Sequence, residues 1–268
     1  MTSPTIDGTA ETANVLRMRG VSKTFGAVAA LKNVDLDVNR GEVLALVGDN
    51  GAGKSTLIKI LSGVFPSDSG TIYIDGKERA ITSPADARSA GIATVYQDLA
   101  LCDNLTVVNN LFLGQEISPA NLDETAMEVK SWELLKQLSA KIPSVQVAIA
   151  SLSGGQRQTV AIARSLLGEP SLILLDEPTA ALGVAQTAEV LNLIERLRDN
   201  GLAVIMITHN MVDVRAVSDR IAVLRLGQNH GFFLTKDVSN SDLVASITGA
   251  TDNEVTRRES RVHQDQEG

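Results

Sequence analysis

Residues 48–56 of the chain read Gly48-Asp49-Asn50-Gly51-Ala52-Gly53-Lys54-Ser55-Thr56. This run matches the pattern G-x-x-x-x-G-K-[ST] of a phosphate-binding loop. Its glycines allow the backbone to curl so that the N–H groups point inward and form a nest of anion size. The apolar run Val43–Val47 comes before the loop, and a helical pattern over Ser55–Leu61 follows it. The loop therefore joins a predicted strand to a predicted helix, whose positive dipole end points at the same anion.

Two side chains of this run have the chemistry that a nucleoside triphosphate needs. We expect Lys54 to reach the β- and γ-phosphates and the Ser55 hydroxyl to ligate Mg²⁺. The alternative is a glycine-rich turn that opens an ordinary helix. The flanking strand and helix favour the nucleotide site, because the motif requires that context. All nine residues of the run are expected to contact the nucleotide.

Three further apolar runs predict strands of one parallel sheet. They are Ile92–Tyr96, Leu172–Leu175 and Ala203–Ile207, and none of them alternates with polar residues. Such runs fit strands buried on both faces, as in a parallel sheet covered by helices. A buried helix segment competes for any single run. Four runs, counting Val43–Val47, each bounded by turn or polar residues, favour strands.

Other parts of the chain predict an antiparallel edge and a helical insertion. Val34–Asn39 alternates apolar and polar residues, and Thr71–Ile74 runs into Asp75-Gly76, which is typical of a hairpin turn. Residues 98–157 contain no strand-like run, and Asp123–Leu138 has an apolar helical face. We therefore expect a helical subdomain within a sheet domain.

The predicted fold class is α/β, with a P-loop NTPase core of mainly parallel sheet, an antiparallel β edge and an inserted α-helical subdomain. The main domain is expected to span residues 15–249. Residues 1–14 and 250–268 are polar and mixed, and they cannot bury enough apolar surface to offset their ordering entropy. We expect both to be mobile tails.

The composition excludes several classes of protein. The chain has 268 residues, with 24 Lys and Arg against 32 Asp and Glu, and a net charge of −8. This balance argues against a general nucleic-acid binder, and the single cysteine, Cys102, excludes an internal disulfide framework. No apolar stretch approaches the roughly 20 residues that cross a bilayer. The first residues lack the features of a signal peptide, so we expect an intracellular protein in reducing conditions.

Polar side chains follow three of the predicted strands, at the sheet edge where ligands of α/β proteins bind. Asp176 suits Mg²⁺ through a water molecule, and the next residue, Glu177, can orient or deprotonate an attacking water. Gln97 can meet Mg²⁺ or that water, and we expect His209 to contact the γ-phosphate. The alternatives are a surface acid pair, a solvated glutamine and a structural histidine.

A second segment suited to phosphate occurs at Leu152-Ser153-Gly154-Gly155-Gln156. Ser153 and Gln156 have the spacing of a capping box for a helix that runs to Leu167. A cap does not explain two consecutive glycines in the first helical turn, because glycine lowers helix stability. Bare N–H groups of Gly154 and Gly155, beside the Ser153 hydroxyl, are typical of a phosphate site.

These motifs, in this order, resemble those of the ATP-binding cassette (ABC) ATPases over about residues 15–248. They stand here as the Walker A loop GDNGAGKS, the Q-loop Gln97, the signature LSGGQ, the Walker B segment LILLDE and the switch His209. The resemblance implies a RecA-like fold and a head-to-tail homodimer with ATP between the subunits. It further implies that Ser153, Gly154 and Gly155 of one subunit cover the ATP bound to the Walker A loop of the other.

The same resemblance implies three side-chain roles. Glu177 is the expected general base, and His209 is its expected partner at the γ-phosphate. Phe25 in Lys23-Thr24-Phe25-Gly26 matches the aromatic residue that stacks on adenine, with core packing as the alternative.

A narrower resemblance is to the ATPases of bacterial monosaccharide importers, in the ribose, xylose and fructose branch. It rests on SPADARSAGIATVYQDLALCDNLTVVNNLFLG and on DEPTAALG. Gly183 stands where the wider family usually has an aspartate, so no carboxylate is available there for a contact across the dimer. The resemblance implies transmembrane permease subunits and, indirectly, an extracytoplasmic sugar-binding protein as partners. It implies a peripheral place on the cytoplasmic face of the inner membrane, and from the charge balance we expect no nucleic-acid partner.

The leading hypothesis is therefore an ATP-hydrolysing subunit that energises monosaccharide uptake through a separate permease. An ABC ATPase for another transported substrate is the first alternative. A non-transport ABC ATPase, such as a DNA-repair head, would carry long coiled coils between Walker A and the signature, and no sustained heptads occur here. Another P-loop enzyme, a kinase or a GTPase, would leave LSGGQ unexplained, and no Asn-Lys-x-Asp guanine reader is present.

Overall fold

The computed structural model describes residues 14–117 and 122–249. The expected mobile tails fall outside these ranges, except for Asn14, which begins the first strand. Among the helices of the described ranges, none combines the length and the hydropathy that crossing a membrane would require.

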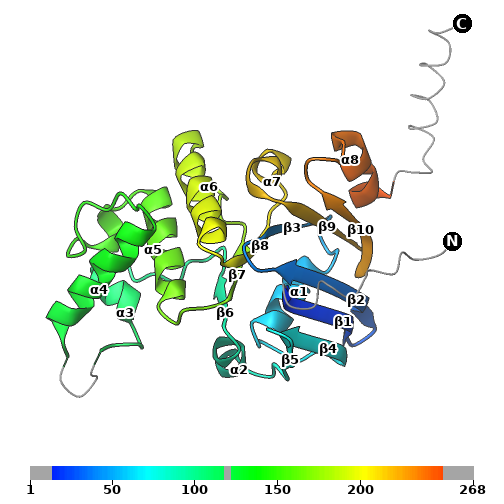
Figure 1. Cartoon of the computed structure of the whole chain (residues 1–268), viewed down its shortest axis with the longest axis horizontal. Helices are drawn as coiled ribbons and strands as arrows, with labels where there is room; N and C mark the ends of the chain where they lie inside the picture. Colours follow the sequence, from blue (N-terminus) through cyan, green and yellow to red (C-terminus); the bar gives the residue numbers. More distant parts are fainter. Residues whose placement is uncertain (1–13, 118–121, 250–268) are drawn as a thin grey trace, which may run out of the picture.

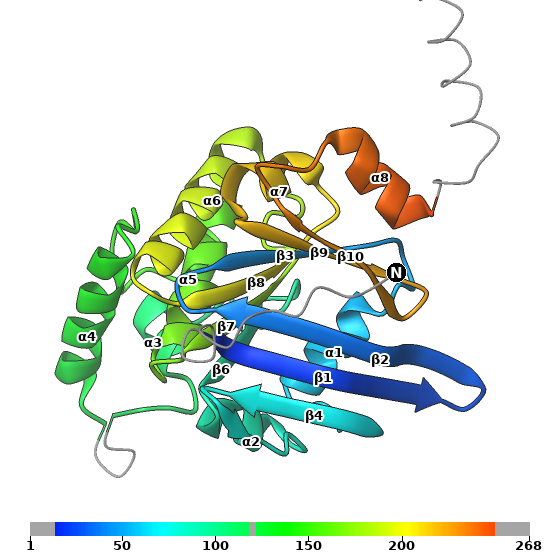
Figure 2. The same cartoon turned by 45° about the vertical axis from the view of Figure 1, so that its right-hand side comes forward.

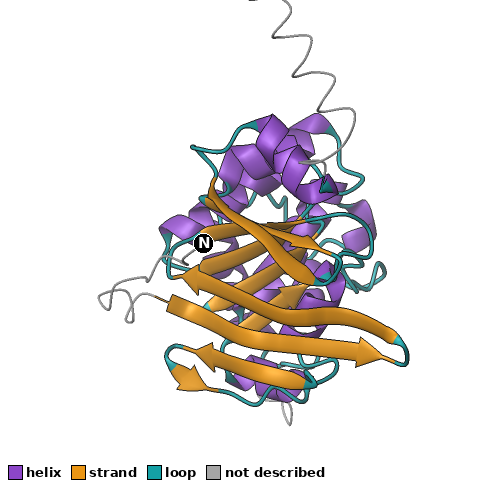
Figure 3. Cartoon of the chain, turned by 90° about the vertical axis from the view of Figure 1, so that its right-hand side faces the viewer, coloured by secondary structure: helices purple, strands orange, loops and turns teal. Residues whose placement is uncertain are grey.

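Two sheets lie one against the other (Figures 2 and 3). The smaller is antiparallel, with the strand order β2-β1-β4-β5. Its strands are β1 (Asn14–Phe25), β2 (Val28–Asn39), β4 (Ser69–Ile74) and β5 (Lys77–Glu78). The turn Asp75-Gly76 joins β4 to β5, as the hairpin pattern predicts, and Asp75 and Gly76 both have positive φ.

The larger sheet has six strands in the order β10-β9-β3-β8-β7-β6. Its strands are β3 (Val43–Val47), β6 (Ile92–Val95), β7 (Leu172–Asp176), β8 (Ala203–Ile207), β9 (Arg220–Arg225) and β10 (Gln228–Leu234). Strands β3 and β6 to β9 are parallel, whereas β10 pairs antiparallel with β9. All four predicted buried runs are strands of this sheet, although β6 ends at Val95, one residue earlier than expected.

Helices pack on the faces of this sheet or against another helix. They are α1 (Lys54–Leu61), α2 (Pro84–Ser89), α3 (Val107–Phe112), α4 (Glu124–Gln137), α5 (Gly154–Leu166), α6 (Val184–Asp199), α7 (Met211–Val217) and α8 (Asn240–Thr248). Of these, α4 packs against α3 (Figure 1). Strand β3 shows why both faces are apolar. Leu44 and Leu46 join the core between the sheets and α1, whereas Val43, Ala45 and Val47 join cores on the opposite face.

Residues 98–157 lie between β6 and β7 and carry the helices at one side of the molecule (Figure 1). They comprise α3, α4, a 3₁₀ turn at Ile149–Ser151 and the start of α5. We expected a mostly helical block, but the block is helical only in part, because loops without helix run over 98–106 and 138–148. Buried Asn110 holds the first loop, with its side chain accepting from the Cys102 amide (2.7 Å) and donating to the Thr106 carbonyl (3.0 Å).

Candidate nucleotide-binding site

The loop of residues 48–53 has a backbone that only glycine tolerates at two positions. Gly48 has φ 152° and Gly53 has φ 107°. A Cβ on Gly48 would overlap the carbonyl oxygen of Leu224, and one on Gly53 would lie 2.6 Å from Leu31 Cδ2. The loop is therefore packed directly against β9 and β2, which fixes where its N–H groups point.

Lys54, the first residue of α1, has its ammonium group inside this loop. Its Nζ donates to the carbonyls of Gly48 (2.5 Å) and Asp49 (3.0 Å). Burial lowers the pKa of Lys54, and this effect outweighs the charges of Glu177, Asp49 and Asp176, which raise it. The lysine is thus partly desolvated and poised for an anion in the nest.

A cleft of about 680 Å³ opens in front of the loop. It brings together Lys54, Ser55, Gln97, Asp176 and Glu177, which come from four separate elements or loops of the chain. Of the Walker A run, the residues that line the cleft are Asn50, Gly51, Ala52, Gly53, Lys54, Ser55 and Thr56. Gly48 and Asp49 do not line the cleft, and their carbonyl oxygens accept hydrogen bonds from Lys54 Nζ.

Asp176 and Glu177 come at the end of β7. Glu177 has φ 50°, a left-handed conformation that is uncommon for a residue with a side chain. Its N–H donates to the Ile207 carbonyl of β8 (2.9 Å), which fixes the turn. Burial raises the pKa of Asp176, and the neighbouring Glu177 charge raises it further, against the lowering effect of Lys54 and Lys59. Asp176 is therefore a partly buried carboxylate next to a second one.

His209 follows β8 and contacts Glu177 directly. Its Nδ1 lies 2.9 Å from Glu177 Oε1, and its side chain is 80% exposed whereas that of Glu177 is 17% exposed. An ionised carboxylate can only accept a hydrogen bond, so the proton of this contact is assigned to Nδ1. The pair predicted from two separate strand ends is thus brought together, and the Nε2 atom is left for another partner.

Phe25 does not line the cleft, although it ends β1 close to Val28, which does. It is 45% exposed and packs edge-to-face against Phe65 at 5.1 Å between ring centroids. Lys23 Nζ lies 5.7 Å from the Phe25 centroid. The Phe25 side chain is therefore partly packed and partly exposed to solvent.

The segment 152–156 lies outside this cleft. Ser153 caps α5 in the predicted capping box, in which its Oγ accepts from the Gln156 amide and the Gln156 side chain accepts from the Ser153 amide. The two glycines also have a packing role that the sequence did not reveal. A Cβ on Gly154 would lie 2.9 Å from Leu182 Cδ2, and one on Gly155 would lie 3.1 Å from Gln186 Cβ. The two glycines therefore give Leu182 and Gln186 room to approach the start of α5 closely, apart from any ligand.

Sequence reasoning missed the cleft wall formed by β2 and by the turn after β9. The residues concerned are Val28, Ala29, Ala30, Lys32 and Leu226. Their position depends on the antiparallel sheet lying beside the loop, where Ala30 and Leu31 approach Gly53. No local pattern in the sequence marks them.

We expect Gly48→Ala to abolish nucleotide binding, because the new Cβ would overlap the Leu224 carbonyl and the loop would have to move. The expected loss of stability is about 2 kcal/mol or more. Fluorescence of a bound ATP analogue and thermal melting measure the two effects. Gly51→Ala is the matched control, since Gly51 has φ 81° but no atom within 4 Å of the added Cβ. Equal effects of both substitutions would contradict the role assigned to close packing.

Comparison with known proteins agrees with this geometry. The family model described as ABC transporter matches residues 31–180. The chain is 48% identical over 217 residues to the xylose/arabinose import ATP-binding protein XylG of Sulfolobus acidocaldarius, covering 81% of this chain and 86% of that protein. It is 44% identical over 245 residues to the fructose import ATP-binding protein FrcA of Rhizobium meliloti, covering 88% and 94%. It spans about half (46%) of the ribose import ATP-binding protein RbsA 2 of Escherichia coli O157:H7, at 43% identity.

Solved structures are also similar. The ADP conformation of MJ1267, an ATP-binding cassette of an ABC transporter, has a TM-score of 0.79 and 29% identity, covering 89% of this chain and 100% of that one. A dimeric post-hydrolysis state of the ATP-binding cassette MJ0796, bound to ADP and Pi, has a TM-score of 0.69 and 27% identity, covering 83% and 100%.

Proposed function

The chain belongs to the ABC transporter family of ATP-binding cassettes, and on that premise we propose that it energises the import of a monosaccharide through a separate permease. As a member of this family it binds ATP and hydrolyses it. The observation that carries the proposal is the cleft itself. One lysine, one hydroxyl and two carboxylates converge there on the phosphate nest, and a histidine contacts the second carboxylate.

Catalysis in this cleft rests on positioning and on electrostatics. The loop amides and Lys54 bind the β- and γ-phosphates, with Lys54 exchanging the Gly48 and Asp49 carbonyls for phosphate oxygens. Glu177 orients the attacking water and accepts its proton. His209 holds the Glu177 carboxylate through Nδ1 and presents Nε2 towards the γ-phosphate.

The cleft residues fit a bound Mg²⁺. Asp176 and Glu177 place two neighbouring carboxylates at the cleft, and burial, with the Glu177 charge as the second cause, raises the pKa of Asp176. The Ser55 hydroxyl, the Gln97 amide oxygen and Asp176 are oxygen ligands of the kind that Mg²⁺ prefers. When bound, Mg²⁺ neutralises the charge that develops on the phosphates.

A second copy of the chain supplies the other half of each site. Ser153, Gly154 and Gly155 form the N-terminus of the 13-residue helix α5, where Ser153 is exposed, Gly154 half-buried and Gly155 buried, and they lie outside the cleft of their own chain. A head-to-tail pairing places this N-terminus over the γ-phosphate of the partner. Gly183, which caps α6 nearby, brings no carboxylate to this contact. Phe25, half-exposed beside the cleft, is the proposed adenine contact.

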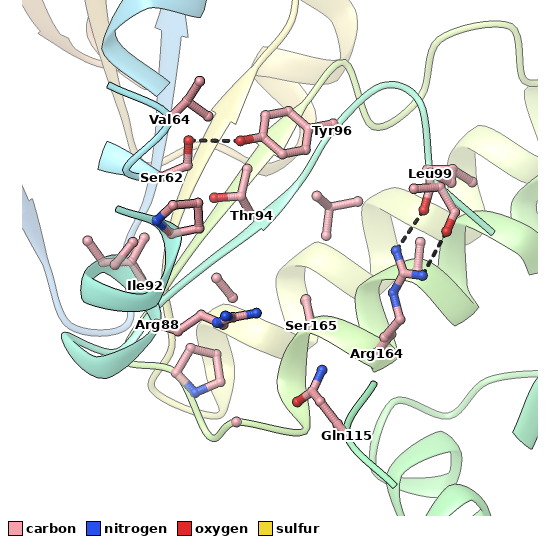
Figure 4. A pocket seen from close by; sticks show the side chains of 18 of the residues that line it. Ser62, Val64, Arg88, Ile92, Thr94, Tyr96, Leu99, Gln115, Arg164 and Ser165 are labelled. Atoms are coloured by element: carbon pink, nitrogen blue, oxygen red, sulfur yellow. Dashed lines mark hydrogen bonds between the residues drawn. The ribbon is translucent and has the colours of Figure 1, made fainter. Parts of the chain in front are cut away.

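A groove next to Gln97 is the proposed docking site for a permease segment (Figure 4). Its volume is about 480 Å³, and its walls come from α2, β6, α5 and the end of α1. The Tyr96 hydroxyl donates to Ser62 Oγ (2.8 Å), and Arg164 donates to the Leu99 and Ala100 carbonyls (both 2.8 Å). The first bond links Tyr96, just before Gln97, to the C-cap residue of α1. The others link the two residues at 99 and 100, just after Gln97, to α5. Both helices begin at the proposed phosphate-binding segments. Movement of either helix is thus transmitted to the groove, on the cytoplasmic side of the membrane.

Uptake of labelled sugars tests the cargo class. Deletion of the gene in host cells should lower high-affinity uptake of at least one of xylose, arabinose, fructose and ribose by about tenfold or more. Wild-type chain should restore uptake, and Glu177→Gln should not. Uptake of a disaccharide and of an amino acid are the controls. If only a control solute lost its uptake, the chain would be an ABC ATPase for another transported substrate.

A further inference from the structure

The contact between Glu177 and His209 joins two loops that follow different strands, β7 and β8. The His209 ring is 80% exposed, so packing does not hold it in place. An exposed side-chain pair loses rotamer freedom when it forms, and such pairs contribute little by themselves. A catalytic pair of this kind therefore needs a second connection between the two loops.

A buried hydrogen bond supplies that connection. Thr179 Oγ1 donates to Asp213 Oδ2 at 2.6 Å. Thr179 is two residues after Glu177, and Asp213 is four residues after His209, in the first turn of α7. Their residues are 9% and 2% exposed, respectively. The catalytic mechanism above does not use this buried carboxylate.

We propose that the Thr179–Asp213 bond is a lock that positions the Glu177–His209 pair. The proposal rests on the proposed function, in which Glu177 and His209 act on the water and the γ-phosphate. Thr179 and Asp213 touch neither ATP nor water in that mechanism, so both are positioning residues. The lock fixes the distance between the loop after β7 and the helix after β8, and with it the geometry of the pair above.

The chemistry of the lock makes it hard to open. A hydroxyl-to-carboxylate bond of this length is charge-assisted and stronger than a neutral one. Breaking it in place would leave a buried carboxylate without this partner, which costs more than a solvated one. The negative charge of Asp213 is also favoured in the first turn of α7 by the helix dipole.

The test uses variants that keep the shape of the lock. Thr179→Val replaces the hydroxyl by a methyl group of similar size, and it should lower kcat for ATP about 10- to 100-fold, because small displacements of catalytic groups have effects of this size. The KM for ATP should stay within about twofold, since the phosphate loop is untouched. Thr179→Ser restores the hydroxyl and should return kcat to within about threefold of wild type. Asp213→Asn keeps a weaker, neutral acceptor and should lower kcat less than Thr179→Val.

The matched control is Ser218→Ala, at the other end of α7. Ser218 Oγ and Thr235 Oγ1 form a buried hydroxyl pair at 3.0 Å, away from the cleft. Its loss should lower the melting temperature about as much as Thr179→Val does, without changing kcat. A merely structural role of Thr179 would make the two variants alike both in kcat and in the His209 signals described next.

A spectroscopic measurement separates the lock from the proposed function. The chain has three histidines, so the ring signals of ¹⁵N-labelled His209 can be assigned by their loss in His209→Gln. Glu177→Ala gives the signals of a ring without its carboxylate. Thr179→Val should move the His209 signals towards that reference, and Ser218→Ala should not.

Unmoved His209 signals in Thr179→Val, or no recovery in Thr179→Ser, would overturn the lock. If Thr179→Val does not fold, unmoved signals in Asp213→Asn would overturn it equally. Moved signals with wild-type kcat would leave the lock intact and would count against the proposed catalytic role of the Glu177–His209 pair.

Discussion

Glu177→Gln should lower ATP turnover by about 1,000-fold and leave ATP binding almost unchanged. The amide has the size of the carboxylate, and its oxygen can still accept from His209 Nδ1, so the geometry of the 2.9 Å contact is kept. The group proposed to take the proton from water is lost, and general-base catalysis is worth about 10²- to 10⁴-fold. Phosphate release and the affinity for an ATP analogue measure the two quantities.

This variant should also accumulate as a dimer when ATP is present. Hydrolysis is what reopens the ATP-bound pair in the proposed mechanism, so blocking it favours the closed state. Sedimentation with and without ATP detects the shift. Glu189→Gln, on the surface of α6, is the matched control and should behave as wild type. Turnover close to wild type in Glu177→Gln would show that the base had been assigned to the wrong residue.

Lys54→Ala has the second large effect, this time on binding. In the proposed mechanism its two hydrogen bonds pass to phosphate oxygens when ATP binds, and hydrogen bonds to charged groups are worth about 1.5–3 kcal/mol each. We expect the Kd for ATP to rise about 100-fold or more. Titration with a fluorescent ATP analogue measures the change. Lys59→Ala, in the last turn of the same helix, is the control for charge alone.

A mixing experiment with Lys54→Ala tests the composite site. A dimer of Lys54→Ala and Ser153→Arg has one site with both defects and one with neither. Mixing the two inactive variants should therefore restore part of the ATPase activity, about a quarter of wild type if the sites act independently. A mixture as inactive as its components would argue against sites shared between subunits.

The predictable part of this structure depends on local patterns. The apolar runs over Val43–Val47, Leu172–Leu175 and Ala203–Ile207 are strands because each is short, continuous and bounded by turn or polar residues. Their order along the sheet brings Lys54 and Glu177 to the same edge, as parallel topology requires. The fold class predicted from the sequence is confirmed by the structure and by its solved relatives.

The unpredicted part depends on contacts between distant residues. The antiparallel strand β10 and the wall around Lys32 have no local signal, because their positions depend on how the two sheets meet. The packing of Gln186 against Gly155 likewise joins two helices that no sequence period relates. The Thr179–Asp213 bond spans 34 residues of chain and belongs to the same class.

The two carbonyls that hold Lys54 have a consequence for the cycle of the enzyme. A cation left alone after product release would pull the loop inward or would bind the departing phosphate too tightly. Here the Gly48 and Asp49 carbonyls accept from Lys54, so in the proposed mechanism ATP binding is an exchange of acceptors around its ammonium group. Because the carbonyls compete with phosphate for the ammonium group, ATP should bind less tightly than the phosphate contacts alone would suggest, and the products should leave more easily. Both effects favour an ATPase that has to release its products in every cycle before it binds ATP again.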